Sequence, residues 1–559
     1  MSYTRAVYSY KVEFIPGMNF FLEDQLTEIA IVSLIDINGN LVDTRQLPVL
    51  PRMLVYKAMN KGLDIDISGF FIQNFSLVEY REEFGFKLDA RIDINNFKAD
   101  FSVFEASEAV DFSLVNFHGK ETTFKNTHFG IGNVIFDRTN FENKIVNFSK
   151  SSFSEGAVSF KYTNFGNGVV SFENTVFRNG DISFLNSFFN DGLINFKNVD
   201  FGDGDVSFHY SEFGDGDVIF HRSKFNAGLV DFSKVNFGEG KVDFRHCDFK
   251  DSEVSFEEID HKNNRILFKR DRFGNRKISF NKSEIQNSEI IFDEAEFGDG
   301  SLTFNGALCS RISLKNCILS NYLDLRVDTC RIIDLSDSIV QNLVDLERGN
   351  TSVNLDRLYI YGVRILGKIF ISWENNNIKK IIGEQHETSY DQKMDQYRIL
   401  KEVFHSTGQY EDEDRAYVEF KRNELLAKVD ERKEEGGIRK PIGYVGYGLK
   451  KAVFDWVGLY ATSPGRVLIS IFLVYGAYSV LYVLFELSGH GAISCITPGL
   501  SIFEKVIDSF YFSAVTFLTI GYGDCTPTGI FKVIAPFEGW MGVFMMSYFT
   551  VAFARKILR

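Results

Sequence analysis

The stretch VSFHYSEFGDGD, residues 206–217, decides the fold of the larger part of this 559-residue chain. Val206 and Phe208 are apolar and two residues apart, and Phe213 stands directly before the corner Gly214-Asp215-Gly216-Asp217. Residues two apart lie on the same face of a strand. The stretch therefore predicts two short strands with inward-facing phenylalanines, joined at a glycine-containing corner.

The same pattern repeats every 12 residues from about residue 96 to residue 304. Phe occurs 58 times in the sequence and Trp only 3 times, because two phenylalanine ladders run through this region. One ladder comprises Phe148, Phe160, Phe172, Phe184, Phe196, Phe208, Phe220, Phe232, Phe244 and Phe256, and the other Phe153, Phe165, Phe177, Phe189, Phe201, Phe213, Phe225, Phe237 and Phe249. A fixed period is the signature of stacked structural repeats. We expect two repeats, or 24 residues, per four-sided turn rather than 12, because two Phe in a 12-residue turn need a wider interior.

A small or aliphatic residue followed by Phe two positions later resembles the pentapeptide-repeat proteins. This resemblance implies a square, right-handed β-helix. The chain departs from the family pattern by two extra residues, usually near a glycine, in every second pentad. After Phe304 the inward positions become aliphatic, as at Leu314 and Leu335, and the pattern ends near residue 372. We therefore expect a β-solenoid over residues 96–372 of a multi-domain chain.

Two groups of residues within the coil are interpreted as structural. The aspartates at the glycine corners are taken as solvated turn residues: Asp203, Asp205, Asp215 and Asp217. They faintly resemble the calcium-binding turns of other β-rolls, but the paired glycines of those turns are absent, so bound Ca²⁺ is not expected. The cysteines contain no C-x-x-C pair and are taken as small inward or strand residues: Cys247, Cys309, Cys317 and Cys330.

The segments on either side of the coil follow other patterns. Residues 1–95 contain a strand signal at 29–35 and a turn at 36–40, and predict a small mixed domain that caps the coil. Residues 385–432 have helical spacing and predict a hairpin somewhat like a tetratricopeptide unit. We interpret this hairpin as a connector or tetramer contact, with a partner-peptide site as the alternative. Residues 433–465 predict a charged linker and a helix at the membrane interface.

Residues 466–559 contain two apolar segments long enough to cross a bilayer, Val467–Leu487 and Ile534–Ala554. Basic residues precede the first and follow the second, so the positive-inside rule places both ends in the cytoplasm. Between them, residues 502–518 have a helical pattern too short to span, which leads directly into Thr519-Ile520-Gly521-Tyr522-Gly523-Asp524. Irregular backbone at membrane depth is tolerated only where it is buried in protein or lines a water-filled path.

This hexapeptide resembles the T-V-G-Y-G-D selectivity filter of the potassium channels, with Ile520 in place of valine. The order of helix, half-helix, loop and helix is that of the two-helix channels. The resemblance implies K⁺ sites lined by backbone carbonyls at Thr519, Ile520, Gly521, Tyr522 and Gly523. It implies filter support from Tyr511, Phe512 and Asp524. It also implies a gating hinge at Gly542 and a cavity lined by Val543, Met546, Thr550 and Ala554.

The function we expect is a homotetrameric potassium channel of the cell membrane, with K⁺ as the permeant ion and without enzymatic activity or a cofactor. The N-terminal part is expected to be a cytoplasmic regulatory or assembly domain that takes a cytoplasmic ligand or protein. The alternative is a membrane-tethered interaction scaffold that uses the acidic coil. The net charge of −14 argues against nucleic acid as a partner. No Arg-rich helix indicates a voltage sensor, and because the sequence ends near the second span, we expect gating from the N-terminal side.

Three residues near the predicted outer side are open to two interpretations. Cys495 and Cys525 both fall where a disulfide can persist, and whether they pair is left open. Glu538 is interpreted as a solvated carboxylate at the outer end of the second span. The alternative places the Glu538 carboxylate behind the filter.

Overall fold

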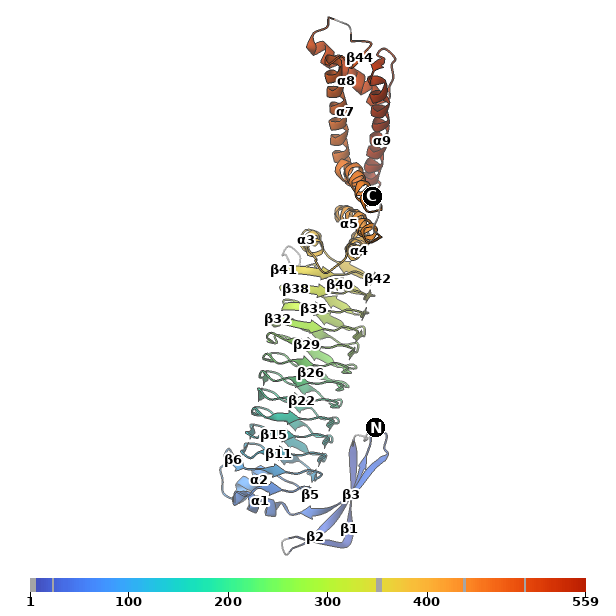
Figure 1. The fold of residues 1–559 in the computed structure, drawn as a ribbon. Coiled ribbons are helices and arrows are strands. Elements are labelled where there is room, and N and C mark those ends of the chain that lie inside the picture. The colour runs from blue at the N-terminus through green and yellow to red at the C-terminus, as the bar shows by residue number, and fades with distance from the viewer. Residues whose placement is uncertain (1–6, 23–24, 348–353, 436–438, 497–498, 559) are drawn as a thin grey trace. The chain divides into compact units, whose positions relative to one another are not determined.

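The computed structural model describes residues 7–22, 25–347, 354–435, 439–496 and 499–558. Its backbone divides into two compact units, Met1–Gln385 and His386–Arg559. The first unit is a parallel β-coil preceded by a small antiparallel sheet, and the second consists mainly of helices (Figure 1). The predicted fold class, a β-solenoid joined to a helical C-terminal domain, is confirmed.

Two long parallel sheets form opposite sides of the coil. The 13-stranded sheet contains β4 (Ile65–Asp66), β7 (Phe97–Lys98), β11 (Glu121–Thr123), β15 (Ile145–Asn147), β18 (Val169–Ser171), β22 (Ile194–Asn195), β25 (Val218–Ile219), β27 (Val242–Asp243), β29 (Arg265–Leu267), β32 (Glu284–Ile291), β35 (Leu308–Ser313), β38 (Thr329–Asp334) and β41 (Asn354–Tyr359). The 12-stranded sheet contains β9 (Ala109–Asp111), β13 (Asn133–Ile135), β17 (Val158–Ser159), β20 (Ile182–Ser183), β23 (Val206–Ser207), β26 (Leu229–Asp231), β28 (Glu253–Ser255), β31 (Ile278–Ser279), β34 (Ser301–Thr303), β37 (Tyr322–Asp324), β40 (Leu343–Asp345) and β43 (Lys368–Phe370).

The register of these strands sets the length of a turn. Val158 pairs with Ile182, and Ile182 pairs with Val206, so residues 24 apart lie side by side. Two further sides carry short pairings with the same offset, as between Val176 and Asp200. The expected 24 residues per turn are therefore confirmed for this part of the coil. Nearer its C-terminal end the turns shorten, and Leu302 pairs with Leu323.

The phenylalanine ladders form the core of the coil. Phe148 stacks on Phe172 of the next turn with ring centroids 4.9 Å apart and planes 3° apart. Phe160 meets Phe172 edge-to-face, with centroids 5.6 Å apart and planes at 85°. All three rings are fully buried. Offset-stacked and edge-to-face pairs are the arrangements that aromatic rings prefer, so one residue type fills the interior without voids.

The corner glycines are required by the close approach of successive turns. A Cβ atom on Gly216 would lie 2.0 Å from the carbonyl oxygen of Gly192, which is far inside van der Waals contact. The corner aspartates satisfy backbone groups across the same gap, because Asp217 Oδ1 accepts a hydrogen bond of 3.0 Å from the Lys241 N–H. This bond gives a structural reason for an aspartate at the corner.

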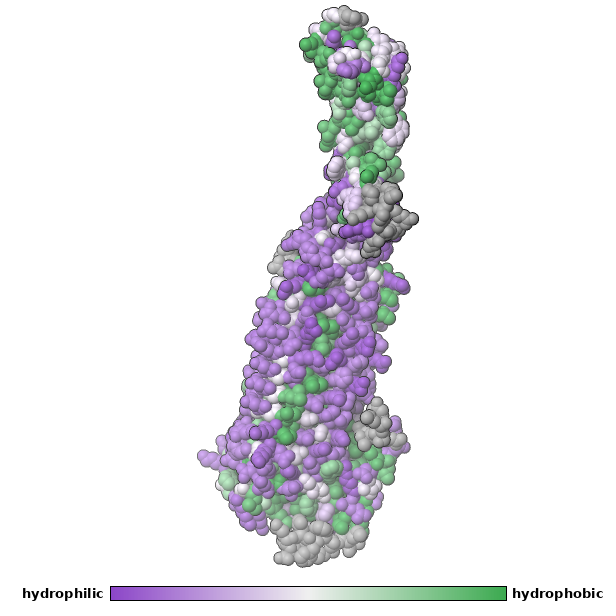
Figure 2. All heavy atoms as spheres, in the orientation of Figure 1, coloured by the Kyte–Doolittle hydropathy of each residue, from purple (hydrophilic) through white to green (hydrophobic). Residues whose placement is uncertain are grey.

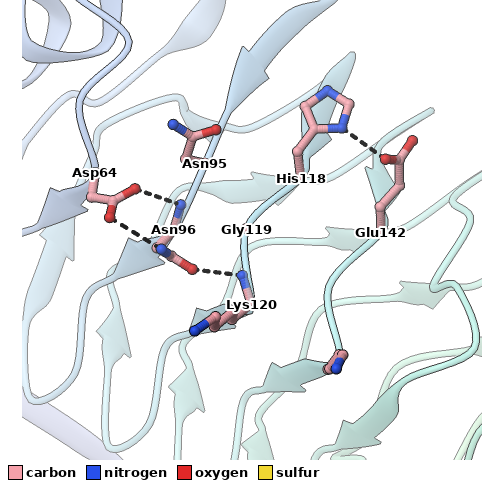
Figure 3. Close-up of a pocket in the computed structure, with 8 residues that line it drawn as sticks. Asp64, Asn95, Asn96, His118, Gly119, Lys120 and Glu142 are labelled. Carbon is pink, nitrogen blue, oxygen red and sulfur yellow. Dashed lines mark hydrogen bonds and ion pairs between the residues drawn. The ribbon is translucent and has the colours of Figure 1, made fainter.

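Figure 3 shows the same economy at a corner near the start of the coil, around a polar hollow of about 440 Å³. Asn96 Nδ2 donates to Asp64 Oδ2 at 3.1 Å, and Asn96 Oδ1 accepts from the Lys120 N–H at 2.7 Å. His118 Nδ1 lies 2.7 Å from Glu142 Oε2. These polar groups bond one another across successive turns, so they hold the corner together.

Removing one ring from the ladder is expected to destabilise the coil strongly. Phe208 lies between Phe184 and Phe232, with centroid distances of 4.7 and 4.9 Å. Phe208→Ala should lower the free energy of unfolding of the coil by about 3–5 kcal/mol, because it leaves a cavity. Tyr210→Ala is the matched control, since Tyr210 is 46% exposed, and should cost about 0.5 kcal/mol or less. Urea unfolding followed by far-UV circular dichroism measures both, and equal losses would contradict the ladder core.

The antiparallel sheet at the N-terminus packs against the first turns of the coil. It consists of β1 (Ser9–Leu22), β2 (Gln25–Ile35) and β3 (Leu41–Leu50), and β3 continues in parallel into β5 (Phe71–Gln73). Apolar residues of β2 are buried against Phe71 and other coil residues. Helices α1 (Arg52–Asn60) and α2 (Leu77–Glu83) follow, and α3 (Ile378–Gly383) comes after the last turn.

The parallel sheets begin earlier than the predicted boundary at residue 96. Strands β4 and β5 already pair in parallel with β7 and with β8 (Val103–Glu105). The expected strand at 29–35 lies within β2, and Asp36 Oδ1 accepts from the Asn38 and Asn40 N–H groups in the turn that follows. The regular phenylalanine period thus marks the regular part of the coil, which starts after its first paired strands.

The second unit begins with a helical hairpin, α4 (Tyr390–Ser406) and α5 (Tyr410–Glu435). Helix α6 (Arg439–Lys450) and the π-helix η1 (Lys451–Trp456) follow, where the sequence predicts an interfacial helix. The remaining helices are α7 (Pro464–Leu487), α8 (Ile502–Phe517) and α9 (Phe531–Ile557). Figure 2 shows apolar side chains gathered over these three helices, whereas the visible face of the coil is mostly hydrophilic.

Candidate ion-conducting site

The short helix α8 is fixed at its N-terminus by a capping box. Ser501 Oγ accepts a hydrogen bond of 3.3 Å from the Glu504 N–H, and Glu504 Oε2 accepts one of 2.8 Å from the Ser501 N–H. This reciprocal pair satisfies two backbone donors that helix formation leaves unpaired. The sequence Ser-x-x-Glu therefore sets where α8 starts.

The C-terminus of α8 delivers the chain into the candidate filter through a Schellman motif. The Ile520 N–H donates to the Val515 carbonyl at 2.9 Å, and the Thr519 N–H donates to the Thr516 carbonyl at 3.0 Å. The motif needs a residue in the left-handed region just past the helix, and Thr519 has φ 54°. Thr519 is not a glycine, so its conformation is set by the surrounding bonds.

The candidate filter loop alternates in backbone conformation. Gly521 and Gly523 have φ values of 64° and 80°, so with Thr519 every second residue is left-handed. Ile520 and Tyr522 lie between them with large exposed side chains, 46% and 69% accessible. Glycine adopts positive φ without steric cost, which explains its two positions in this loop. The structure thus places the five predicted filter residues together, in one irregular, exposed segment after α8.

The predicted support residues lie beside the loop. Tyr511 Oη donates to Asp524 Oδ2 at 2.7 Å and so ties the outer end of the loop to α8. Phe512 is buried, and its ring meets that of Tyr482 on α7 edge-to-face at 5.1 Å. The two neighbouring aromatic residues therefore hold the loop from one side and α7 from the other.

Glu538 is buried, which corrects the expectation of a solvated outer carboxylate. Its side chain accepts a hydrogen bond of 2.7 Å from Tyr482 Oη of α7 and another from Ser513 Oγ of α8. A carboxylate can be buried when hydrogen bonds replace its lost water. Glu538 therefore joins α7, α8 and α9 behind the filter loop, as the alternative interpretation had it. Its partners lie 56 and 25 residues away in sequence, beyond the reach of local pattern.

Gly542 lies where α9 crosses the end of α8. A Cβ atom at this position would stand 1.9 Å from the Phe517 carbonyl oxygen. Helix α9 is continuous through Gly542, so its role as a hinge stays a prediction. Of the four predicted cavity residues, Val543, Met546 and Thr550 are exposed or half-exposed, and Ala554 is half-exposed, in the single chain.

Cys495 and Cys525 form a disulfide, which answers the question that the sequence left open. Next to it, β44 (Gly491–Ile493) pairs antiparallel with β45 (Pro527–Gly529). The bridge and this small sheet tie the loop after α7 to the segment that follows the filter. The outer mouth is thus braced from two sides.

Thiol labelling should report this pairing directly. Maleimide should label no cysteine in the folded protein and about two after mild reduction, because the other four thiols are buried. The buried thiols are Cys247, Cys309, Cys317 and Cys330. Mass spectrometry counts the labels, and unfolding in denaturant after reduction should raise the count to the full six. Labelling of Cys495 or Cys525 without reduction would contradict the bridge.

The hairpin α4–α5 contacts the region just before α7. Arg422 on α5 binds Asp455 of η1 with both its Nε and Nη2 atoms, at 3.0 and 2.8 Å. The Asp455 side chain is only 5% exposed, so this two-point ion pair is largely desolvated on the acid side. The Tyr548 hydroxyl of α9 then donates to the Phe454 carbonyl and accepts from the Ala461 N–H.

The same hairpin also holds the end of α9. Arg555 Nη2 lies 2.9 Å from Asp414 Oδ1 of α5, and its guanidinium lies 4.4 Å from the centre of the Tyr417 ring. Both contacts favour the cation, the first by charge and the second through the ring's π face. Helix α5 therefore touches both ends of the chain that frames the pore segment on this side, η1 and α9.

Among the described residues, α7 is the one helix with the length and apolar composition to cross a membrane. Helix α9 is 27 residues long but carries charged residues at both ends and Glu538 within, so its crossing stays a prediction. The buried partners of Glu538 offset part of that charge.

Residues 470–559 match a protein-family model described as an ion channel. Two curated proteins are similar over 73 residues: Protein LctB of Bacillus caldotenax, 34% identical, and Protein LctB of Geobacillus stearothermophilus, 36% identical. Each alignment covers 12% of this chain and 52% of the relative, so the chain spans about half the length of the curated relatives it matches. No solved structure matches the chain. The predicted resemblance of the C-terminal segment to a channel pore is confirmed by the family match.

Proposed function

We propose that this chain, whose C-terminal segment matches the ion-channel family, is a potassium-selective channel assembled from four copies. The observation that carries the proposal is the left-handed alternation at Thr519, Gly521 and Gly523 directly after a capped short helix. Rings of backbone carbonyls from four such loops can replace the hydration shell of K⁺. Potassium then passes down its electrochemical gradient without a chemical reaction.

In this proposal the filter sites are formed by the carbonyls from Thr519 to Gly523 and by the Thr519 hydroxyl. Tyr511 and Asp524 brace the outer end of the filter through their hydrogen bond. Val543, Met546, Thr550 and Ala554 line the cavity below, and Gly542 is the hinge of α9. The exposure of Val543 and Met546 in the single chain supports a face that further copies or a water-filled path would cover.

We assign the coil the role of a cytoplasmic regulatory or assembly domain, with both ends of the pore segment in the cytoplasm. Support comes from α5, which follows the coil in sequence and contacts both η1 and the end of α9. A change in the hairpin would thereby reach the helix that carries the hinge. The proposal leaves the stimulus open to a small ligand or a protein.

Gly521→Asp tests the filter assignment. The substitution places a carboxylate and a Cβ at a position with φ 64°, and potassium flux through reconstituted vesicles should fall to the level of empty vesicles. Gly489→Asp is the matched control: Gly489 has φ 72°, a Cβ atom there would meet no other atom within 4 Å, and the residue lies outside the filter. Equal flux in Gly521→Asp and the control would overturn the assignment.

A further inference from the structure

The margin between strand β1 and the coil contains a pocket of about 340 Å³. One wall comes from β1, through Tyr10, Val12 and Phe14, and the floor comes from one side of the coil. The volume is at the small end of the range found for ligand pockets. The hollow in Figure 3 differs from it, because there the polar groups of Asp64, Asn96 and Lys120 bond one another.

The floor of this pocket is a column of residues from successive turns. Phe104, Phe129, Phe153 and Phe177 pair in register through β8, β12 (His128–Phe129), β16 (Ser152–Phe153) and β19 (Val176–Phe177). The residues that follow them are Glu105, Gly130, Ser154 and Arg178. Neighbouring strands lie about 4.8 Å apart, so the Cα atoms of the first and last are roughly 14 Å apart. Two small residues thus lie between an acid and a base.

The two ends of the column are fixed by aromatic residues of the N-terminal strand. Glu105 Oε2 accepts a hydrogen bond from Tyr10 Oη. The Arg178 guanidinium lies 4.5 Å from the centre of the Tyr8 ring and 3.6 Å, through Nη1, from Glu155. Gly130 keeps the floor low, since a Cβ atom there would stand 2.7 Å from Glu105 Oε2 and 2.8 Å from Tyr10 Oη.

Arg178 retains hydrogen-bonding capacity inside the pocket. Its Nε atom is buried and has no hydrogen-bond partner among the described residues. A guanidinium offers a planar fork of donors, and a carboxylate is the group that fits this fork best. A buried donor without a partner costs free energy, so a ligand carboxylate that pairs with it would gain more than at an exposed arginine.

The side walls between the charged ends are apolar. Phe14 is 44% exposed and meets Phe71 edge-to-face at 5.7 Å, and Ile131 is 63% exposed. Exposed large apolar side chains beside a pocket favour an aliphatic ligand body, because covering them removes apolar area from water. The pocket therefore presents an acid, an apolar middle and a base in sequence.

We propose that this pocket binds a small zwitterion whose carboxylate and ammonium groups are separated by a short apolar chain. The carboxylate pairs with Arg178, the ammonium group pairs with Glu105, and the chain lies over Gly130 and Ser154 against Phe14. The site lies on the N-terminal unit alone, so its occupancy is independent of whether the pore conducts. The proposal adds a ligand class to a coil that the sequence patterns explain only as a scaffold.

Isothermal titration calorimetry on the full chain in detergent tests this proposal with three probes: 6-aminohexanoate, hexanoate and 1-hexylamine. The zwitterion should bind once per chain, and each single-charge analogue about tenfold or more weakly. Arg178→Gln and Glu105→Gln should each weaken zwitterion binding about tenfold or more. Arg178→Gln should also abolish the preference for 6-aminohexanoate over 1-hexylamine, a change in specificity that mere loss of stability would not produce.

Arg138→Gln is the matched control, because Arg138 also lies over a tyrosine ring, Tyr162 at 5.9 Å, but outside the pocket. It should bind 6-aminohexanoate like the wild-type chain, and all variants should keep the wild-type melting temperature. No binding of 6-aminohexanoate to the wild-type chain would overturn the proposal. So would unchanged binding in Arg178→Gln, or equal affinity for the three probes.

Discussion

Gly542→Val is expected to abolish potassium flux and to destabilise the folded pore segment. A Cβ at this position would lie 1.9 Å from the Phe517 carbonyl oxygen, which belongs to the backbone of α8 just before the filter. Backbone cannot rotate aside as a flexible side chain can, so α8 and α9 must move apart. Overpacking of this kind costs about 3 kcal/mol, enough to reduce the folded fraction on the order of 100-fold.

The control for this change is Gly476→Val in α7. A Cβ at Gly476 has no atom within 4 Å, so the same substitution in a neighbouring helix adds no clash. Flux through reconstituted vesicles and the melting temperature in detergent should stay near wild type for Gly476→Val and fall for Gly542→Val. If both variants conduct like the wild type, the close crossing of α8 and α9 is wrong.

Glu538→Leu is expected to produce the second large effect. The carboxylate accepts hydrogen bonds from Tyr482 and Ser513, and a leucine leaves both hydroxyls without this acceptor. Each buried hydroxyl without a partner costs about 1–3 kcal/mol. Because Ser513 lies on α8, the loss falls on the helix that positions the filter, and selectivity for K⁺ over Na⁺ should fall together with stability.

The conservative variant separates hydrogen bonding from charge. Glu538→Gln keeps a side-chain oxygen at the same position, so it should retain more of the wild-type melting temperature and selectivity than Glu538→Leu. Flux ratios in vesicles and melting in detergent give the two readouts. Equal behaviour of the two variants would contradict a role for Glu538 as the shared acceptor.

Much of the coil follows from local pattern. The step of 12 between Phe148 and Phe160 and the two-residue spacing of Val206 and Phe208 predict inward ladders, and the observed stacks confirm them. Such predictions work because the period of a strand decides which side chains face inward. The corner glycines were predicted as turn residues, whereas at Gly216 the requirement is space against Gly192. That requirement arises between turns and is invisible within one.

The site was predicted less completely. Thr519 to Gly523 stand in one segment after α8, as the hexapeptide indicated, and their roles stay predictions. The bond between Tyr482 and Glu538 and the contact of Asp414 with Arg555 join residues distant in sequence. Neither pair carries a local spacing signal, since both form only when separate helices pack. For the same reason the charge of Glu538 alone suggested a solvated position.

The central claim is tested most directly by ion selectivity of the purified wild-type chain in lipid vesicles. Vesicles loaded with K⁺ and diluted into a K⁺-free medium should develop a K⁺ diffusion potential that a voltage-sensitive dye reports. Vesicles loaded with Na⁺ in the same way should show no more signal than protein-free vesicles. Equal signals for K⁺ and Na⁺, or no signal for either ion, would contradict the account of residues 519–523 as a potassium filter.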